Sequence, residues 1–297
     1  MESRLISLLE SSKRVFILGP SHHVYLDGCA LSKCTEYTTP LGALPLDRPS
    51  MLLSTVSPLI LRAFAAIEEL KKTGKFSEMD LSTDEDEHSI EMHLPYVRKI
   101  FEGYVTPLYL MSHETNPIIR KEISIVPVLV GAINKEKEEA FGRILAPYLA
   151  SADTFFVVSS DFCHWGTRFS YTLYYPQYPL GSTPPVRLSR SAASPPELST
   201  FPIHESIDAL DHEAMELLSL PPSTAHQAHV FFAEYLERTN NTICGRHPIG
   251  VLLGALTVVQ DENRKSPLLQ WVRYEQSSRC FTIKDSSVSY ASAYIAF

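Results

Sequence analysis

Apolar and polar positions divide this chain into two kinds of segment. Short runs of apolar, often β-branched or aromatic residues predict strands at residues 15–18, 123–130 and 154–159, and alternating runs predict two more at 268–276 and 288–295. Apolar residues spaced three and four apart predict helices at residues 59–72, 89–100, 135–149, 204–218, 228–238 and 249–259. Strands that alternate with helices indicate an α/β fold with a central, mainly parallel or mixed sheet flanked by helices.

Two stretches interrupt this pattern. Residues 175–202 are rich in Pro, Ser and Tyr, a composition typical of a long surface insertion. Residues 103–117 suggest a smaller insertion of the same kind. Strand and helix patterns resume on both sides of each stretch, so we expect a single domain spanning residues 1–297 with a surface insertion at 175–202.

Charge and cysteine content indicate which partners and which cellular location to expect. The formal net charge is -8 and the basic residues are scattered, which argues against a nucleic-acid partner. No apolar run reaches the roughly 20 residues that a membrane-spanning helix needs. The five cysteines are odd in number and include no CxxC pair, so we expect reduced thiols. These features predict a cytoplasmic protein, with the nucleus as an alternative location.

Polar residues gather just after two of the predicted strands, where α/β proteins often carry their functional groups. The segment VFILGPSHH ends a strand with His22 and His23, and we expect one of the two rings to face a site. The segment FFVVSSDFCHWG places Asp161, Cys163 and His164 after another strand. Asp161 could fix the tautomer of His164 and raise its basicity.

Two more segments carry candidate chemistry. In NTICGRHPIG, Cys244 precedes a predicted helix start beside Arg246, a setting that favours a thiolate acting as a metal ligand or nucleophile. In TDEDEHSIEMHLPY, His88 and Glu91 are three residues apart on a predicted helix and could reach a pocket. A solvated acidic helix start is the stronger interpretation of this last segment taken alone.

Together these segments resemble the Memo family (mediator of ErbB2-driven cell motility). The stretches RVFILGPSHH, TDEDEHSIEMHLPY, IVPVLVGAI, FFVVSSDFCHWG, NTICGRHPIGVLL and KDSSVSYASAY follow one another in the family's order over nearly the whole chain. The resemblance implies a fold like that of class III extradiol dioxygenases and LigB-like proteins.

The resemblance also implies a site. Family members place two histidines and one cysteine around iron or copper, and His22 and Cys244 match one of those histidines and the cysteine. Asp161 and His164 match the adjoining pocket segment, for which we expect catalytic roles. The family is linked to cell migration, to phosphotyrosine-type peptides or other signalling partners, and to copper-dependent redox chemistry.

This chain departs from the family at its N-terminus. The family stretches H-A-G-S-W-Y and P-H-A-G-Y do not occur, so the second family histidine has no counterpart here. A misplaced start and a genuine short form both explain this difference.

Four functions follow from these residues. The first is a metal-binding signalling or redox protein rather than a classical catalyst. The second is a dioxygenase-like, non-haem iron oxidoreductase. The third is a hydrolase with Cys244 as nucleophile and His164 and Asp161 as base and orienting group. The fourth is a phosphopeptide-binding module in which Arg246 contacts the phosphate. We favour the first, with the fourth compatible with it.

Overall fold

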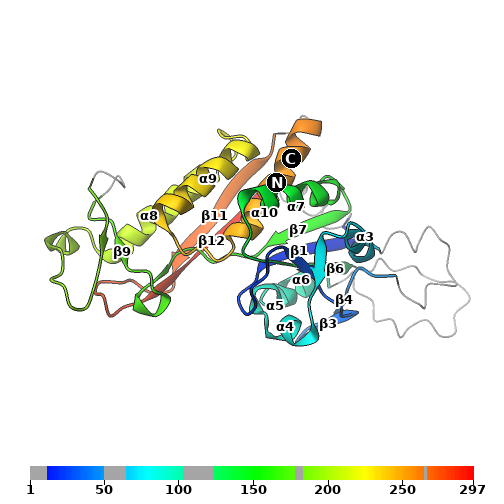
Figure 1. The fold of residues 1–297 in the computed structure, drawn as a ribbon, viewed down its shortest axis with the longest axis horizontal. Helices are drawn as coiled ribbons and strands as arrows, with labels where there is room; N and C mark the ends of the chain where they lie inside the picture. The colour runs from blue at the N-terminus through cyan, green and yellow to red at the C-terminus, as the bar shows by residue number, and fades with distance from the viewer. Residues whose placement is uncertain (1–11, 50–64, 103–122, 178–182, 264–265) are drawn as a thin grey trace, which may run out of the picture. The chain divides into compact units, whose positions relative to one another are not determined.

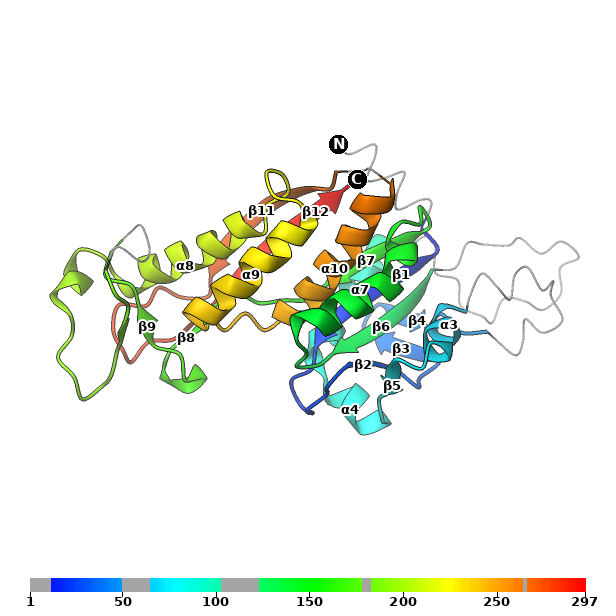
Figure 2. The same ribbon diagram turned by 45° about the horizontal axis from the view of Figure 1, so that its top comes forward.

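A computed structural model describes residues 12–49, 65–102, 123–177, 183–263 and 266–297. The chain divides into two compact units, Met1–Ser159 and Ser160–Phe297. Figures 1 and 2 show the helices and strands of both units.

The first unit is built on a five-stranded sheet with the order β5-β2-β6-β1-β7. Strand β1 lies parallel to β6 and β7, β2 is parallel to β5, and only β2 and β6 run antiparallel. The bounds are β1 Arg14–Pro20, β2 Cys29–Leu31, β5 Phe76–Glu78, β6 Ser124–Val130 and β7 Thr154–Val158. This sheet confirms the predicted strands at 15–18, 123–130 and 154–159, and the predicted α/β class with a mixed, mainly parallel sheet.

Helices flank this sheet because alternate residues of β1 point to opposite faces. Phe16 stacks on Phe156 and also contacts Tyr148 of helix α7 (Lys135–Leu149), whereas Gly19 faces Ser89 of helix α5 (His88–Glu91). Figure 1 accordingly shows α7 and α5 on opposite sides of the sheet. Among the described residues, the remaining elements of this unit are a hairpin and five helices, bounded as follows: β3 Glu36–Thr39, β4 Gly42–Pro45, α3 Ala66–Lys72, α4 Leu81–Asp86, α5 His88–Glu91, α6 Leu94–Ile100 and α7 Lys135–Leu149.

The predicted helix at residues 89–100 is wrong in one respect, because it is two helices. Helix α5 ends at Glu91, Met92 and His93 form a turn, and α6 begins at Leu94. Pro95 lies in the first turn of α6, where its missing N–H costs no helical hydrogen bond. Of the predicted helix at 59–72, the described part forms α3, and residues 59–64 lie outside the described residues.

The second unit combines three long helices with an antiparallel sheet of order β11-β12-β8. Helix α8 contacts α9, and α9 contacts α10. The bounds are β8 His164–Trp165, β9 Leu173–Tyr174, β10 Val186–Arg187, α8 Ile203–Leu217, α9 Ala225–Thr239, α10 Arg246–Asn263, β11 Leu268–Gln276 and β12 Ser287–Ala296, with 3-10 turns at Thr167–Phe169 and Pro196–Ser199. The predicted helices at 204–218, 228–238 and 249–259 and the last two predicted strands are confirmed.

A buried carboxylate joins several of these elements. Asp211 of α8 accepts hydrogen bonds from the Cys163 backbone (3.3 Å), from Nδ2 of Asn241 (3.0 Å) and from the Tyr274 hydroxyl (2.9 Å). Burial raises the pKa of Asp211 to about 6, although these donors oppose the shift. Asp211 therefore ties the segments before His164 and Cys244 to one helix of the unit.

Most described residues of the predicted insertion at 175–202 are exposed, and they include β10 and the turn at Pro196–Ser199. The predicted insertion at 103–117 lies outside the described residues. The extent of the domain, 1–297, stays a prediction. Among the described helices, none combines the length and apolar character needed to cross a bilayer.

Candidate metal centre

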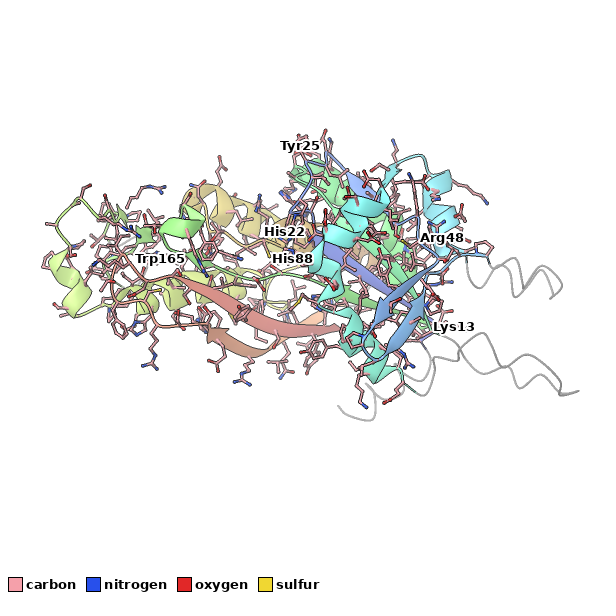
Figure 3. The ribbon with its side chains drawn as sticks, turned by 90° about the horizontal axis from the view of Figure 1, so that it is seen from below. Lys13, His22, Tyr25, Arg48, His88 and Trp165 are labelled. Carbon is pink, nitrogen blue, oxygen red and sulfur yellow. The ribbon has the colours of Figure 1, made fainter. Side chains whose placement is uncertain are left out.

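The end of β1 receives helix α5 at very short range. A Cβ atom on Gly19 would lie 2.5 Å from Oγ of Ser89 and 2.8 Å from Cγ1 of Ile90, so only glycine fits there. The Ser89 hydroxyl donates a hydrogen bond of 2.9 Å to the carbonyl of Pro20. This close packing brings the loop after β1, which carries His22, against the start of α5, which carries His88 (Figure 3).

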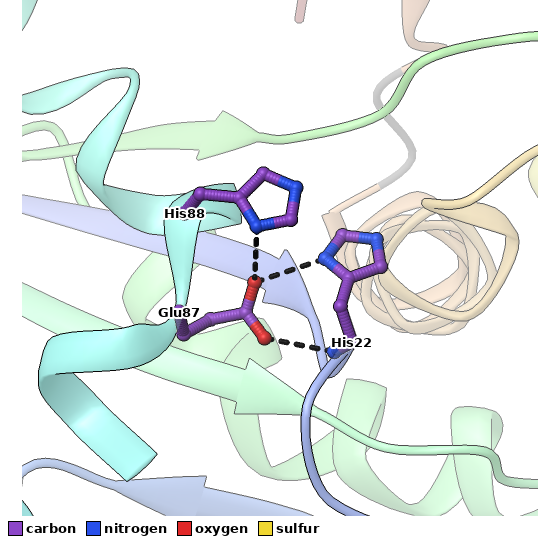
Figure 4. Close-up of side chains that lie close together, drawn as sticks. All are labelled: His22, Glu87 and His88. Carbon is purple, nitrogen blue, oxygen red and sulfur yellow. Dashed lines mark hydrogen bonds and ion pairs between the residues drawn. The ribbon is translucent and has the colours of Figure 1, made fainter. Parts of the chain in front are cut away.

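Three side chains meet at this point: His22, Glu87 and His88. One potential ligand atom from each lies within 4.8 Å of the other two. Glu87 bridges the pair, with Oε1 2.9 Å from Nδ1 of His22 and 3.7 Å from Nδ1 of His88 (Figure 4). The two imidazole rings are stacked with centroids 4.6 Å apart. We call this group the His22 cluster.

Glu87 is held as a carboxylate. Burial raises its pKa, but donors outweigh burial: the His22 side chain, the His22 backbone N–H at 2.8 Å and the Ser89 backbone N–H at 3.0 Å. The result is a pKa of about 2. The Glu87 side chain is only 3% exposed, compared with 29% for His22 and 58% for His88. The cluster is thus a buried anion beneath two partly accessible imidazoles.

This arrangement fits a transition-metal site. Imidazole suits iron and copper, and two histidines with one carboxylate form a common donor set for non-haem iron. The carboxylate on Nδ1 of His22 directs the neutral ring to carry its proton there, which leaves Nε2 as the ligand nitrogen. The two ring planes are 18° apart, so the nitrogen lone pairs lie in nearly parallel planes, and ligation of one ion by both rings requires one ring to turn. His88, the more exposed, has room to do so.

Two other predicted residues of this region lie outside the His22 cluster. His23 is exposed, and its ring meets His88 edge-on with centroids 5.8 Å apart. Glu91 is exposed on α5. Their roles in a pocket stay predictions.

Sequence reasoning missed Glu87, the residue that organises the cluster. It was assigned to an acidic helix start, and it does cap α5 by accepting from the Ser89 backbone. The available signal was its position directly before His88. Its burial depends on the backbone of His22, which is 65 residues away, so local sequence patterns do not reveal it.

The second unit brings Asp161, His164 and Cys244 together. The Asp161 backbone N–H donates to Sγ of Cys244 at 3.0 Å, and Oδ2 of Asp161 lies 3.8 Å from Nε2 of His164. Nδ1 of His164 lies 2.9 Å from the Phe162 carbonyl and 3.0 Å from the Thr242 carbonyl. Two acceptors on Nδ1 require the proton there, so Nε2 is the basic nitrogen in the neutral ring. The three residues thus lie near one another, but the two carbonyls, and not Asp161, set the tautomer of His164. The catalytic and ligand roles of the three residues stay predictions.

Cys163 and Arg246 take different positions near this second group. Burial raises the pKa of the Cys163 thiol well above its ordinary value, which suits a packing role. Arg246, at the start of α10, donates from Nη1 to the Ile243 carbonyl at 3.3 Å. No hydrogen bond within the described part of the chain joins the His164 ring to Cys244, so the hydrolase triad stays a prediction.

Comparisons with known proteins address the family directly. The Memo-like protein family matches residues 3–294. The chain is 42% identical to Protein MEMO1 of Homo sapiens and of Mus musculus over 281 residues, which cover 94% of this chain and 74% of each relative. The memo-1 homolog of Caenorhabditis elegans is 36% identical over 281 residues, or 63% of its length. The crystal structure of an uncharacterized protein from Escherichia coli K12 aligns with this chain with a TM-score of 0.44 and 12% sequence identity. The alignment covers 97% of this chain and 92% of the Escherichia coli chain. By its match over nearly the whole sequence, this chain belongs to the Memo family.

Proposed function

We propose that this chain is a metal-binding Memo-family protein with a signalling or redox role, and that the His22 cluster takes part in binding the metal. The observation that carries this proposal is the cluster itself, in which three ligand atoms of His22, Glu87 and His88 fall within 4.8 Å. A buried carboxylate with a pKa of about 2 attracts a cation and orients the histidine bonded to it.

Each residue has a distinct part in this proposal. His22 and His88 supply imidazole nitrogens, and Glu87 holds the His22 ring in one tautomer. The resemblance to the family adds Cys244 as a thiolate ligand, with Asp161 and His164 as polar residues beside it. Iron or copper bound there would supply one-electron chemistry. The chain's own residues fix ligand orientation and carry the negative charge that offsets the cation.

The test is the metal content of purified variants. The protein is loaded anaerobically with Fe(II) or Cu(I), desalted and analysed for metal per chain. We expect His88→Ala to retain clearly less metal than the parent chain. His226→Ala, which removes an exposed imidazole from α9, is the matched control and retains the parent amount. Equal metal in the His88→Ala and parent proteins would refute the ligand role of His88.

A second candidate function is favoured by the composition of the cluster. Two histidines and one carboxylate are the protein ligands of many iron-dependent oxygenases, and the His22 cluster contains this set. An extradiol dioxygenase activity predicts oxygen uptake when a catechol is added to the Fe(II)-loaded protein, and no uptake by Glu87→Gln. An absence of uptake by the parent protein would exclude this activity for the catechols tested.

The proposed function also includes a binding partner. Family membership supports a signalling partner, and Arg246 offers a guanidinium to a phosphorylated peptide. A peptide-binding measurement in which Arg246→Ala changes nothing would remove that residue from the proposal.

A further inference from the structure

A basic hollow lies in the second unit, and none of its lining residues takes part in the proposed function. It is open and has a volume of about 500 Å³. Arg187 and Arg190 line it together with the hydroxyl residues Thr167, Ser170 and Ser189. No acidic residue of the described chain lines it. The walls therefore present hydrogen-bond donors and positive charge.

Both arginines are anchored on the same turn. Nη1 of Arg187 lies 3.4 Å from the Ser170 carbonyl, and Nη2 of Arg190 lies 3.3 Å from Oγ1 of Thr167. The turn itself is fixed by a 2.7 Å hydrogen bond from the Gly166 N–H to the Tyr171 carbonyl. Each contact uses one nitrogen of a guanidinium, and each guanidinium has five N–H donors. The remaining donors of the two side chains are available to a ligand in the hollow.

The backbone explains why Arg187 reaches this turn. Strand β10 pairs with β9, with Val186 opposite Tyr174 and Arg187 opposite Leu173. Leu188 then turns inward, where it is buried and its N–H donates to the Thr172 carbonyl at 2.9 Å. Arg187 and Ser189, on either side of Leu188, point outward because side chains alternate along an extended segment. Arg190 follows in a turn, from which its side chain reaches Thr167.

The charge of the hollow is unbalanced. Neither Arg187 nor Arg190 forms an ion pair with an acidic residue in the described part of the chain, whereas Arg14, Arg48, Arg238 and Arg273 all do. The whole chain carries a formal charge of -8, so its general field repels anions. Two unneutralised guanidiniums in one hollow of an acidic protein select for an anion by local contacts.

We propose that this hollow binds a phosphate-class dianion, either free phosphate or a small phosphate monoester. A dianion balances two guanidiniums, and its three or four oxygens can accept from both forks and from nearby hydroxyls. A carboxylate carries one charge and is satisfied by a single arginine. The hollow is also large enough for a small organic group on the phosphate.

The test is calorimetric titration at low ionic strength with inorganic phosphate, glycerol phosphate and acetate. We expect saturable binding of at least one of the two phosphates, and binding of acetate at least about tenfold weaker. The relative affinities of phosphate and glycerol phosphate identify which source is preferred. No saturable binding of either phosphate at millimolar concentration, or acetate binding as tightly as phosphate, would overturn the proposal.

Substitutions of the two arginines test whether phosphate binds in this hollow. Arg187→Gln combined with Arg190→Gln should weaken phosphate binding by about tenfold or more. Arg187→Lys, which keeps the charge but loses the fork, should fall between this double variant and the parent. Arg279→Gln removes the same charge from an exposed position elsewhere in the unit and should bind like the parent. Both arginines are exposed, so folding is expected to survive, and circular dichroism checks it. Unchanged phosphate affinity in the folded double variant would place any binding elsewhere and refute the assignment.

Discussion

At the scale of single residues, Glu87 has the most demanding environment in the candidate site. Its side chain is 3% exposed, yet it remains ionised because two backbone N–H groups and an imidazole donate to it. An anion in that position orients His22 and lowers the cost of bringing a cation close to it. The contribution of Glu87 to metal affinity can be separated from that of the histidine ligands by a substitution that keeps the shape of the Glu87 side chain.

Glu87→Gln should weaken metal affinity by about 10–100-fold, the range typical for loss of a group that orients a metal-bound histidine. The amide removes the negative charge and replaces one acceptor oxygen by a donor, so it cannot accept from His22 and Ser89 as the carboxylate does. A competition titration against a chelating dye measures the affinity. Glu85→Gln, which changes an exposed acid of the neighbouring helix α4, is the control. Equal affinity for Glu87→Gln and the parent would contradict an orienting role.

Asp211 predicts a pH effect on stability. Burial raises its pKa from an ordinary value of 3.8 to about 6, so between those two pH values the folded protein retains a proton that the unfolded chain releases. The free energy of unfolding therefore falls as pH rises from about 4 to 6, by about 3 kcal/mol from this group. Asp211→Asn has no carboxyl to titrate and should lack this fall. Urea unfolding of both proteins at several pH values checks it, and parallel curves would show that Asp211 does not titrate in this range.

At the scale of elements, the site depends on how closely α5 approaches β1. Gly19 is the contact point, because any side chain there meets Ser89 and Ile90. The same contact positions His88 beside the loop that carries His22. We therefore expect Gly19 to affect both the stability of the fold and the proposed metal binding.

Gly19→Ala should lower the free energy of unfolding by about 1–3 kcal/mol, the usual cost of inserting a methyl group into a filled space. It should also weaken metal binding, because α5 must shift outward. Gly28→Ala is the matched control, since the added methyl would meet only Cζ of Phe141 at 3.7 Å. Urea unfolding measures the free energy of unfolding of both variants. A Gly19→Ala protein as stable as the Gly28→Ala protein would show that α5 tolerates the displacement.

The helices and strands also show which sequence patterns are sufficient to predict secondary structure. Long periodic segments were predicted well: α7 spans Lys135–Leu149 in sequence and structure alike. The strands β2 and β5 have three residues each, too few to establish a period, and neither was predicted. His22 and His88 were found because they follow recognisable local patterns. Glu87 was missed because its burial arises from a contact between distant segments.

At the scale of the whole molecule, the candidate ligands belong to two compact units. His22, Glu87 and His88 lie in the first, and Cys244 lies in the second with Asp161 and His164. Sequence patterns predict each group locally. They do not predict whether the two groups act on one metal, because that depends on long-range packing, so the shared pocket stays a proposal derived from the family.

Cys244→Ala tests the participation of the second unit. If Cys244 is a thiolate ligand, as the family implies, the variant should lose metal, and the thermal midpoint that rises on adding Fe(II) or Cu(I) to the parent should rise less in the variant. Cys34→Ala, which removes a partly exposed thiol from the first unit, is the control. A metal-induced rise as large in Cys244→Ala as in the parent would exclude Cys244 from the ligand set.

The most direct test of the metal site is the metal bound by His22→Ala. His22 is the residue on which the sequence pattern, the family and the His22 cluster agree. After anaerobic loading and desalting, we predict about one ion per chain in the parent and in His226→Ala. We predict a loss of most of that metal in His22→Ala, although the protein stays folded because the ring is partly exposed. A folded His22→Ala protein that retains the full metal content of the parent would contradict the account.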